Sequence, residues 1–181
     1  MSLGISSLLF FLLLEATVAT SSLKIDTSSG PVQGIIQDST PNVAQFLGIP
    51  FAEQPVGSRR WLPAIIKSRE NGTIDATKLG PACPQYEVDP KLAPNLYVLD
   101  VPEFSVSPFD YQREDCLSVN VWTPWGESDR EDDEEEEEEE LLPVIVWLYG
   151  GAFVAGGANV PYFDPSPWVE RSGRHLVVGI K

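Results

Sequence analysis

The segment of residues 141–158, LLPVIVWLYGGAFVAGGA, constrains the fold of this chain more than any other part. Its first half, residues 142–149, is a short apolar run rich in Val, Ile and aromatic side chains. Such a run is typical of a strand buried on both faces, so we predict a central strand of an α/β sheet. The glycines that follow place bare backbone at the carboxyl end of this strand, where open α/β sheets bind ligands. They fit a tight turn, and they also fit backbone N–H groups turned toward an anionic oxygen.

The neighbouring segments predict further elements of an α/β fold. Alternating apolar and polar side chains in residues 117–122 indicate a half-buried strand. Proline in the first turn and a stopping glycine predict a short helix over residues 165–173, followed by an apolar strand over residues 176–180. The order of strand, glycine-rich loop, helix and strand is how a doubly wound sheet begins.

The first half of the globular part reads as a small antiparallel hairpin followed by a third apolar segment. Residues 22–36 carry a turn signal in their middle, which predicts two short strands, the second including Val32, Ile35 and Ile36. Residues 43–52 are apolar but are broken by a glycine and a proline. Next come Arg59, Arg60 and Trp61. These residues could form a recognition patch, but a guanidinium packed on an aromatic ring or paired with a carboxylate is the favoured interpretation.

Residues 80–115 show no sustained period and are rich in Pro, Asp and isolated aromatics, which predicts a long loop. The two cysteines of the chain, Cys83 and Cys116, stand at its ends. They are compatible with one disulfide or with two buried free thiols. The aromatic side chains of the loop either line a pocket or pack the loop onto the body; they are Tyr86, Tyr97, Phe104 and Phe109.

Residues 1–21 have the pattern of a cleaved signal peptide, because residues 5–14 form an apolar core and small residues follow it. The segment lacks a basic start and contains Glu15, so an uncleaved anchor is the alternative. It is too short to span a bilayer comfortably, and no stable membrane span is expected. A secreted chain favours oxidised cysteines. The one Asn-x-Thr sequon, at Asn71, is then a candidate for N-glycosylation.

The formal net charge of −15 is concentrated in one acidic run. Residues 129–140 contain eleven acids and one arginine, so the rest of the chain is only mildly acidic. Nothing in it indicates a basic nucleic-acid surface. We predict that residues 128–140 are a disordered insertion between two strands. A role in binding calcium or a basic partner is the alternative, but a homopolymer imposes no ligand spacing, so a solvated loop expansion is favoured.

These segments together resemble the N-terminal third of type-B carboxylesterases, the cholinesterase and fungal lipase branch of the α/β-hydrolase fold. The resemblance runs from about Leu23 to the end of the chain and is interrupted by the acidic insertion. It implies an incomplete α/β fold over residues 22–181, with a small antiparallel hairpin followed by the first strands of the central mixed sheet. The matching residues are Gly34, Phe46 to Ala52, Pro55 to Gly57, Arg60 and Trp61, Glu114 to Trp122, and Pro143 to Phe153.

The resemblance also implies roles for particular residues. The family's oxyanion-hole loop falls on Tyr149, Gly150, Gly151 and Ala152, and its donors would be the backbone N–H groups of the last two. Ala152 departs from the family's commoner third glycine, which is tolerable if its φ is negative. The family's first disulfide maps to Cys83 and Cys116, and its structural salt bridge maps to Arg60 and Glu114. No cofactor or metal is implied.

The catalytic triad of the family has no counterpart in these 181 residues, because no serine stands in a Gly-x-Ser-x-Gly frame. The sole histidine, His175, directly precedes a predicted strand and is expected at the surface or at a strand edge rather than as a catalytic base. The resemblance therefore implies a fragment, inactive as written, of a secreted serine hydrolase that acts on small-molecule or lipid esters through an acyl-enzyme.

Two alternatives remain open. One is a non-catalytic, cholinesterase-like adhesion or binding module. The other is a self-sufficient small protein, against which an uncovered apolar edge strand would promote aggregation.

Overall fold

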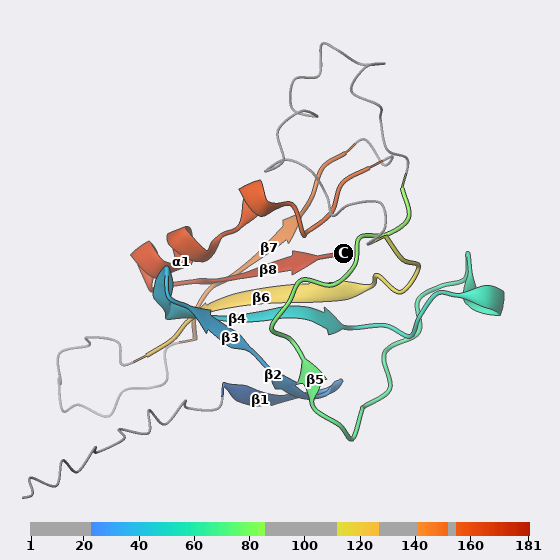
Figure 1. The fold of residues 1–181 in the computed structure, drawn as a ribbon, viewed down its shortest axis with the longest axis horizontal. Helices are drawn as coiled ribbons and strands as arrows, with labels where there is room; N and C mark the ends of the chain where they lie inside the picture. The colour runs from blue at the N-terminus through green and yellow to red at the C-terminus, as the bar shows by residue number, and fades with distance from the viewer. Residues whose placement is uncertain (1–22, 86–111, 127–140, 152–154) are drawn as a thin grey trace, which may run out of the picture.

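The computed structural model describes residues 23–85, 112–126, 141–151 and 155–181 (Figure 1). The predicted signal peptide, the four loop aromatics and the acidic insertion lie outside the described residues. Ala152, one of the two expected oxyanion donors, also lies outside them.

The predicted hairpin is present and belongs to a three-stranded sheet. Strands β1 (Lys24–Thr27) and β2 (Gly30–Gln33) pair antiparallel, and β5 (Ile74–Asp75) adds parallel to β2. The expectation that Ile35 and Ile36 extend the second strand of this hairpin is wrong. They lie in β3 (Ile35–Gln37), which belongs to the other sheet, because the chain passes from one sheet to the other at Gly34. A side chain at Gly34 would collide with the ring of Phe46, so only glycine allows this close crossing.

The larger sheet has five strands in the order β3-β4-β6-β8-β7. Besides β3 it contains β4 (Thr40–Pro50), β6 (Ser118–Pro124), β7 (Val144–Leu148) and β8 (Leu176–Ile180). Strand β8 pairs antiparallel with β6 and parallel with β7, so the sheet is mixed, as predicted. The apolar segment of residues 43–52, which the sequence predicts to be broken at a glycine and a proline, lies mostly in one continuous strand, β4. The strand continues through Gly48 because this residue takes a φ of 71° and the register with β6 shifts there.

Strand β7 lies at an edge of the described sheet, so the prediction of a central strand buried on both faces is wrong for this part of the chain. Val144, Val146 and Leu148 are 56%, 55% and 72% exposed. The apolar run correctly marks a strand, but the strand order depends on a segment that comes later. Strand β8 enters the sheet between β6 and β7, which leaves β7 outermost in Figure 1.

A short helix, α1 (Ser166–Ser172), covers one face of the five-stranded sheet (Figure 1). Its Val169 is fully buried in a cluster with residues of β4, β6 and β8. Gly173 ends the helix in the left-handed conformation, and its N–H donates to the Val169 carbonyl at 2.9 Å. The observed helix thus ends at the glycine from which its end was predicted. Two short 3-10 turns complete the described elements: η1 (Gly57–Arg59) and η5 (Pro161–Phe163).

A second apolar cluster includes residues of both sheets; its buried members are Leu23, Val32, Ala44, Phe46, Ile49 and Ala76. Strand β6 therefore has partly buried Val119 and Val121 against this cluster and buried residues on its other face. None of the helices in the described ranges has the length and apolar character needed to cross a bilayer.

Candidate active site

The glycine loop follows β7 and borders a cavity of about 650 Å³. We use this name for residues 149–157, of which residues 149–151 and 155–157 are described. The remaining walls come from residues 83–85 and from the end of β8 at Ile180 and Lys181. Strands β7 and β8 run parallel, so the cavity lies at their shared carboxyl end. This is where the sequence predicts a ligand site.

Gly151 has a backbone conformation that requires glycine. Its φ is 139°, and an added Cβ would collide with the carbonyl oxygen of Ala155. That residue's N–H donates to the Gly151 carbonyl at 3.2 Å, which closes the loop on itself. Gly151 lines the cavity, and its N–H has no acceptor among the described residues. The backbone therefore offers a donor to a ligand oxygen at this position.

The second half of the glycine loop packs tightly against the first. Gly156 has a φ of 116°, and a Cβ there would collide with the Gly150 carbonyl oxygen and with the ring of Tyr149. The Tyr149 ring in turn lies 6.5 Å, centroid to centroid, from that of Trp147 on β7. The position of Gly156 thus limits where Gly150 can lie.

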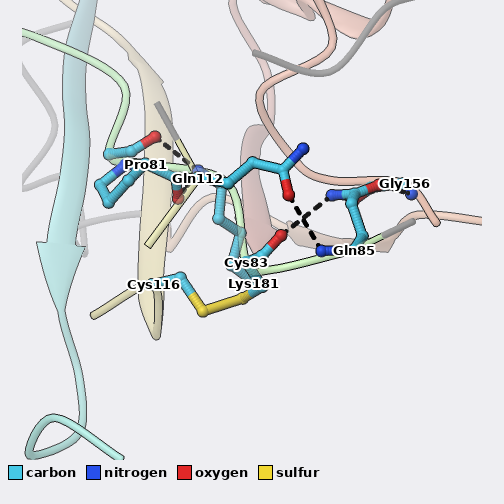
Figure 2. The surroundings of a disulfide bond; sticks show 8 residues. Pro81, Cys83, Gln85, Gln112, Cys116, Gly156 and Lys181 are labelled. Atoms are coloured by element: carbon cyan, nitrogen blue, oxygen red, sulfur yellow. Dashed lines mark hydrogen bonds between the residues drawn. A yellow bond between two sulfur atoms is a disulfide. The ribbon is translucent and has the colours of Figure 1, made fainter. Parts of the chain in front are cut away.

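The disulfide and the ion pair named by the resemblance are both formed. Cys83 and Cys116 are joined, with Cα atoms 5.1 Å apart (Figure 2). The Nη2 atom of Arg60 donates to Oε2 of Glu114 at 2.6 Å, and its Nε contacts the other carboxylate oxygen. This bidentate hydrogen bond lowers the pKa of Glu114 and raises the pKa of Arg60.

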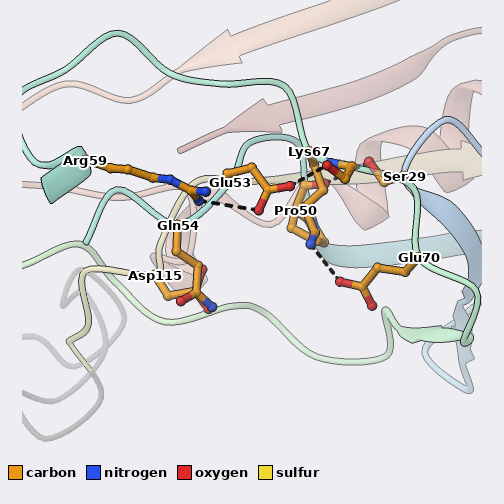
Figure 3. A network of polar contacts seen from close by, with 9 residues as sticks. Ser29, Pro50, Glu53, Gln54, Arg59, Lys67, Glu70 and Asp115 are labelled. Carbon is orange, nitrogen blue, oxygen red and sulfur yellow. Dashed lines mark hydrogen bonds and ion pairs between the residues drawn. The ribbon is translucent and has the colours of Figure 1, made fainter. Parts of the chain in front are cut away.

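The arginine beside it is also paired with a carboxylate. Arg59 lies 3.7 Å from Glu53, whose other oxygen accepts the Ser68 N–H at 2.8 Å (Figure 3). That backbone hydrogen bond is the main reason why the pKa of Glu53 is lowered. Trp61 is fully exposed, so no guanidinium packs on its ring. Pairing with carboxylates, one of the favoured interpretations of the sequence, is confirmed for both arginines.

Asn120 is a site-supporting residue that the sequence analysis missed. It is fully buried on β6, where its Oδ1 accepts the Gly48 N–H at 2.8 Å and its Nδ2 donates to the Ala158 carbonyl at 3.1 Å. It therefore connects the bulge in β4 to the chain just after the glycine loop. The alternation in the sequence of β6 suggests that its apolar residues Val119 and Val121 face the interior. In the structure, the positions between and beside them are the more deeply buried ones: Ser118, Asn120 and Trp122.

Lys181 is the second missed residue. It is only 8% exposed, and its Nζ donates to the carbonyl oxygens of Gly80 at 2.7 Å and Pro81 at 2.9 Å. These bonds attach the segment before Cys83 to the end of β8. Burial lowers the pKa of Lys181 from 10.5 to about 8.

The stability of the chain should therefore rise with pH above about pH 8. Between pH 8 and 10.5 the unfolded chain binds more protons than the folded chain, because the folded pKa of Lys181 is the lower one. The free energy of unfolding should rise by up to about 1.4 kcal/mol per pH unit in this window. Urea denaturation of the native chain and of Lys181→Met at pH 7.5, 8.5 and 9.5 measures the difference. Parallel profiles for the two proteins would contradict the assignment.

His175 is buried and directly precedes β8, so of the two expected positions, the surface or a strand edge, the surface position is wrong. Its Nδ1 lies 2.7 Å from the Ser172 hydroxyl, and its ring lies 4.4 Å from that of Trp168. Both partners belong to α1, which covers the start of β8. The cavity borders the other end of β8, so His175 is not part of it.

Asn71 lies in an exposed bend, and its glycosylation stays a prediction. Within the described ranges no group of three His, Cys, Asp or Glu side chains could hold a metal ion.

Comparison with known proteins identifies relatives over nearly the whole chain. The model of the carboxylesterase family matches residues 21–180. The chain is 36% identical over 156 residues to a chlorogenic acid esterase of Aspergillus niger, covering 86% of this chain and 28% of that protein. It is 37% identical over 183 residues to secreted lipase 5 of Gibberella zeae, covering 94% of this chain and 32% of that protein.

The fold is similar to that of a PNB esterase, with a TM-score of 0.65 at 31% sequence identity. The matched region covers 87% of this chain and 27% of that one. The described sheets and helix are therefore a portion of the α/β-hydrolase fold of these esterases, as predicted. The chain spans about three tenths of the length of the curated relatives it matches.

Proposed function

The chain belongs to the carboxylesterase family, and we propose that it forms the N-terminal part of a secreted serine hydrolase of carboxylic esters. In this proposal the glycine loop supplies the oxyanion hole, with the N–H groups of Gly151 and Ala152 as donors. The observation that carries the proposal is that Gly151 lines the cavity at the carboxyl end of β7, while its N–H has no acceptor among the described residues.

The chemistry of such a site is acyl transfer. A serine hydroxyl attacks the ester carbonyl, and the carbonyl oxygen becomes negatively charged in the tetrahedral intermediate. Backbone donors already aimed at that oxygen stabilise it without reorganising as the charge develops. The serine itself would come from a Gly-x-Ser-x-Gly segment, which these 181 residues do not contain.

Secretion and the class of substrate rest on separate observations. The leader-like residues 1–21 and the Cys83–Cys116 disulfide support an extracellular chain. Relatives named as a chlorogenic acid esterase and a secreted lipase support a small-molecule or lipid ester as substrate.

The 181-residue chain alone is expected not to hydrolyse a short-chain p-nitrophenyl ester above the buffer rate, because it has no activated serine. A spectrophotometric assay with and without a serine-directed phosphonate measures this. A robust rate that the phosphonate removes would contradict the assignment of the nucleophile to another segment.

The coding sequence beyond Lys181 separates an enzyme from a binding module. A Gly-x-Ser-x-Gly motif there supports the hydrolase, and another residue in place of that serine supports a non-catalytic binder.

In an active product, Ala152→Pro removes one donor N–H and should lower kcat by about 10²- to 10³-fold. Ala152→Gly keeps the N–H and serves as the matched control. Equal kcat values for the two variants would overturn the oxyanion role.

A further inference from the structure

We propose that Gln85 is the positioning residue of the glycine loop, holding Gly150 and Gly151 in place so that the Gly151 N–H can meet an oxyanion. The inference rests on the proposed function for the role of that loop. Gln85 is not on the loop and is not adjacent to it in sequence. It lies on the segment that follows Cys83 and reaches the loop with its side chain alone (Figure 2).

Gln85 makes two hydrogen bonds to the backbone of a single residue, Gly156, and we call this pair of bonds the clamp. The Gly156 N–H donates to Oε1 of Gln85 at 2.7 Å, and Nε2 of Gln85 donates to the Gly156 carbonyl at 3.0 Å. A primary amide carries an acceptor oxygen and a donor nitrogen side by side, so it satisfies both backbone groups of a residue at once. Two simultaneous bonds fix the direction of the Gly156 backbone as well as its distance.

Gly156 transmits this restraint to Gly150 and to the expected donor Gly151. It packs so closely on Gly150 that no Cβ fits between Gly156 and the Gly150 carbonyl oxygen. The preceding residue, Ala155, donates its N–H to the Gly151 carbonyl at 3.2 Å. A displacement of Gly156 would therefore move Gly150 and Gly151. A loop rich in glycine has many accessible conformations, so an external restraint is what selects one of them.

Gln85 can act as a restraint because it is itself held from several sides. Its backbone N–H donates to Oε1 of Gln112 at 3.0 Å, and its Nε2 also donates to the Cys83 carbonyl at 3.2 Å. Cys83 is fixed by the disulfide to Cys116. The residues just before it are attached to Lys181 through the Gly80 and Pro81 carbonyls. The side chain is therefore ordered by folding, before any ligand arrives.

The first test measures amide hydrogen exchange of Gly156 by NMR in the full 181-residue chain. Gln85→Leu keeps the bulk of the side chain but removes both bonds, so Gly156 exchange should accelerate by about tenfold or more. Gln54→Leu is the matched control, because Gln54 is an exposed glutamine that bonds Asp115 at 2.7 Å and does not line the cavity. Exchange within twofold of the native rate in Gln85→Leu would overturn the proposal.

The second test uses Gln85→Glu, whose behaviour should depend on pH. When protonated, the introduced carboxyl has one donor and one acceptor and reproduces the clamp. When ionised, it has no donor and faces the carbonyl oxygens of Gly156 and Cys83. Protection of Gly156, corrected for intrinsic exchange, should be close to native at pH 4 and fall as the pH rises to 6.5. Lys181, the charged group that lines the same cavity, stays protonated over this range.

A side chain that only fills space would give no such pH profile, so a flat profile for Gln85→Glu overturns the proposal. This comparison is made within one sample and remains decisive if Gln85→Leu does not fold. The readout is a backbone amide and not ester turnover. An error in the role proposed for Gln85 would therefore be seen in the exchange of the Gly156 amide, and an error in the proposed esterase function would be seen in assays of ester hydrolysis.

Discussion

Replacing Cys83 and Cys116 together by alanine is expected to lower the free energy of unfolding by about 3 to 4 kcal/mol. The disulfide joins residues 33 positions apart, and closing a loop of this length removes conformational entropy from the unfolded chain. It also holds the start of the segment that carries Gln85, next to the bridge between Ala82 and Gln112. Urea denaturation followed by tryptophan fluorescence measures the loss, which should shift the midpoint while the protein stays folded in water at low temperature.

Reduction provides the control for this prediction. A phosphine reductant should destabilise the native chain by a similar amount and leave the double variant unchanged, because the variant has no disulfide to lose. A double variant within about 1 kcal/mol of the native chain would show that the described contacts around Cys83 hold this segment without the covalent bond.

Elements with strong local signals were predictable from sequence. The hairpin of β1 and β2, the strands β6, β7 and β8, and the helix ending at Gly173 all follow from periodicity and from turn or stop residues. Strand order was not predictable in the same way. It depends on pairing between distant segments, and β8 separates β7 from β6 although it follows both in sequence. The two-residue strand β5 has no local signal and exists only through its pairing with β2.

The location of the candidate site was predictable for a physical reason. Glycines after an apolar strand place accessible backbone at the strand's carboxyl end, and the cavity borders that point. The polar residues that hold the loop were not predictable. Gln85, Asn120 and Lys181 act through backbone groups far away in sequence, and patterns of apolar residues contain no information on such contacts. Each is recognisable only when burial and hydrogen-bond partners are known.

Asn120→Ala is the substitution of a single residue with the largest expected effect on stability. The side chain is fully buried and satisfies two backbone groups, the Gly48 N–H at 2.8 Å and the Ala158 carbonyl at 3.1 Å. Alanine leaves both groups without these partners in the interior, and each orphaned group costs about 1 to 3 kcal/mol. The two groups together give an expected loss of about 2 to 6 kcal/mol in the free energy of unfolding, measured by urea denaturation.

Asn42→Ala supplies the matched control for that effect. The Asn42 side chain also donates a short hydrogen bond, to Oε1 of Glu170 at 2.7 Å, but it is exposed. Water can replace the lost partner there, so the loss should stay below about 1 kcal/mol. Both variants lose an asparagine side chain, but only Asn120→Ala leaves backbone groups unsatisfied in the interior. The difference between their losses in free energy of unfolding therefore measures the cost of those unsatisfied groups. Equal losses would mean that water reaches Gly48 and Ala158, and that Asn120 does not connect the β4 bulge to the chain just after the glycine loop in solution.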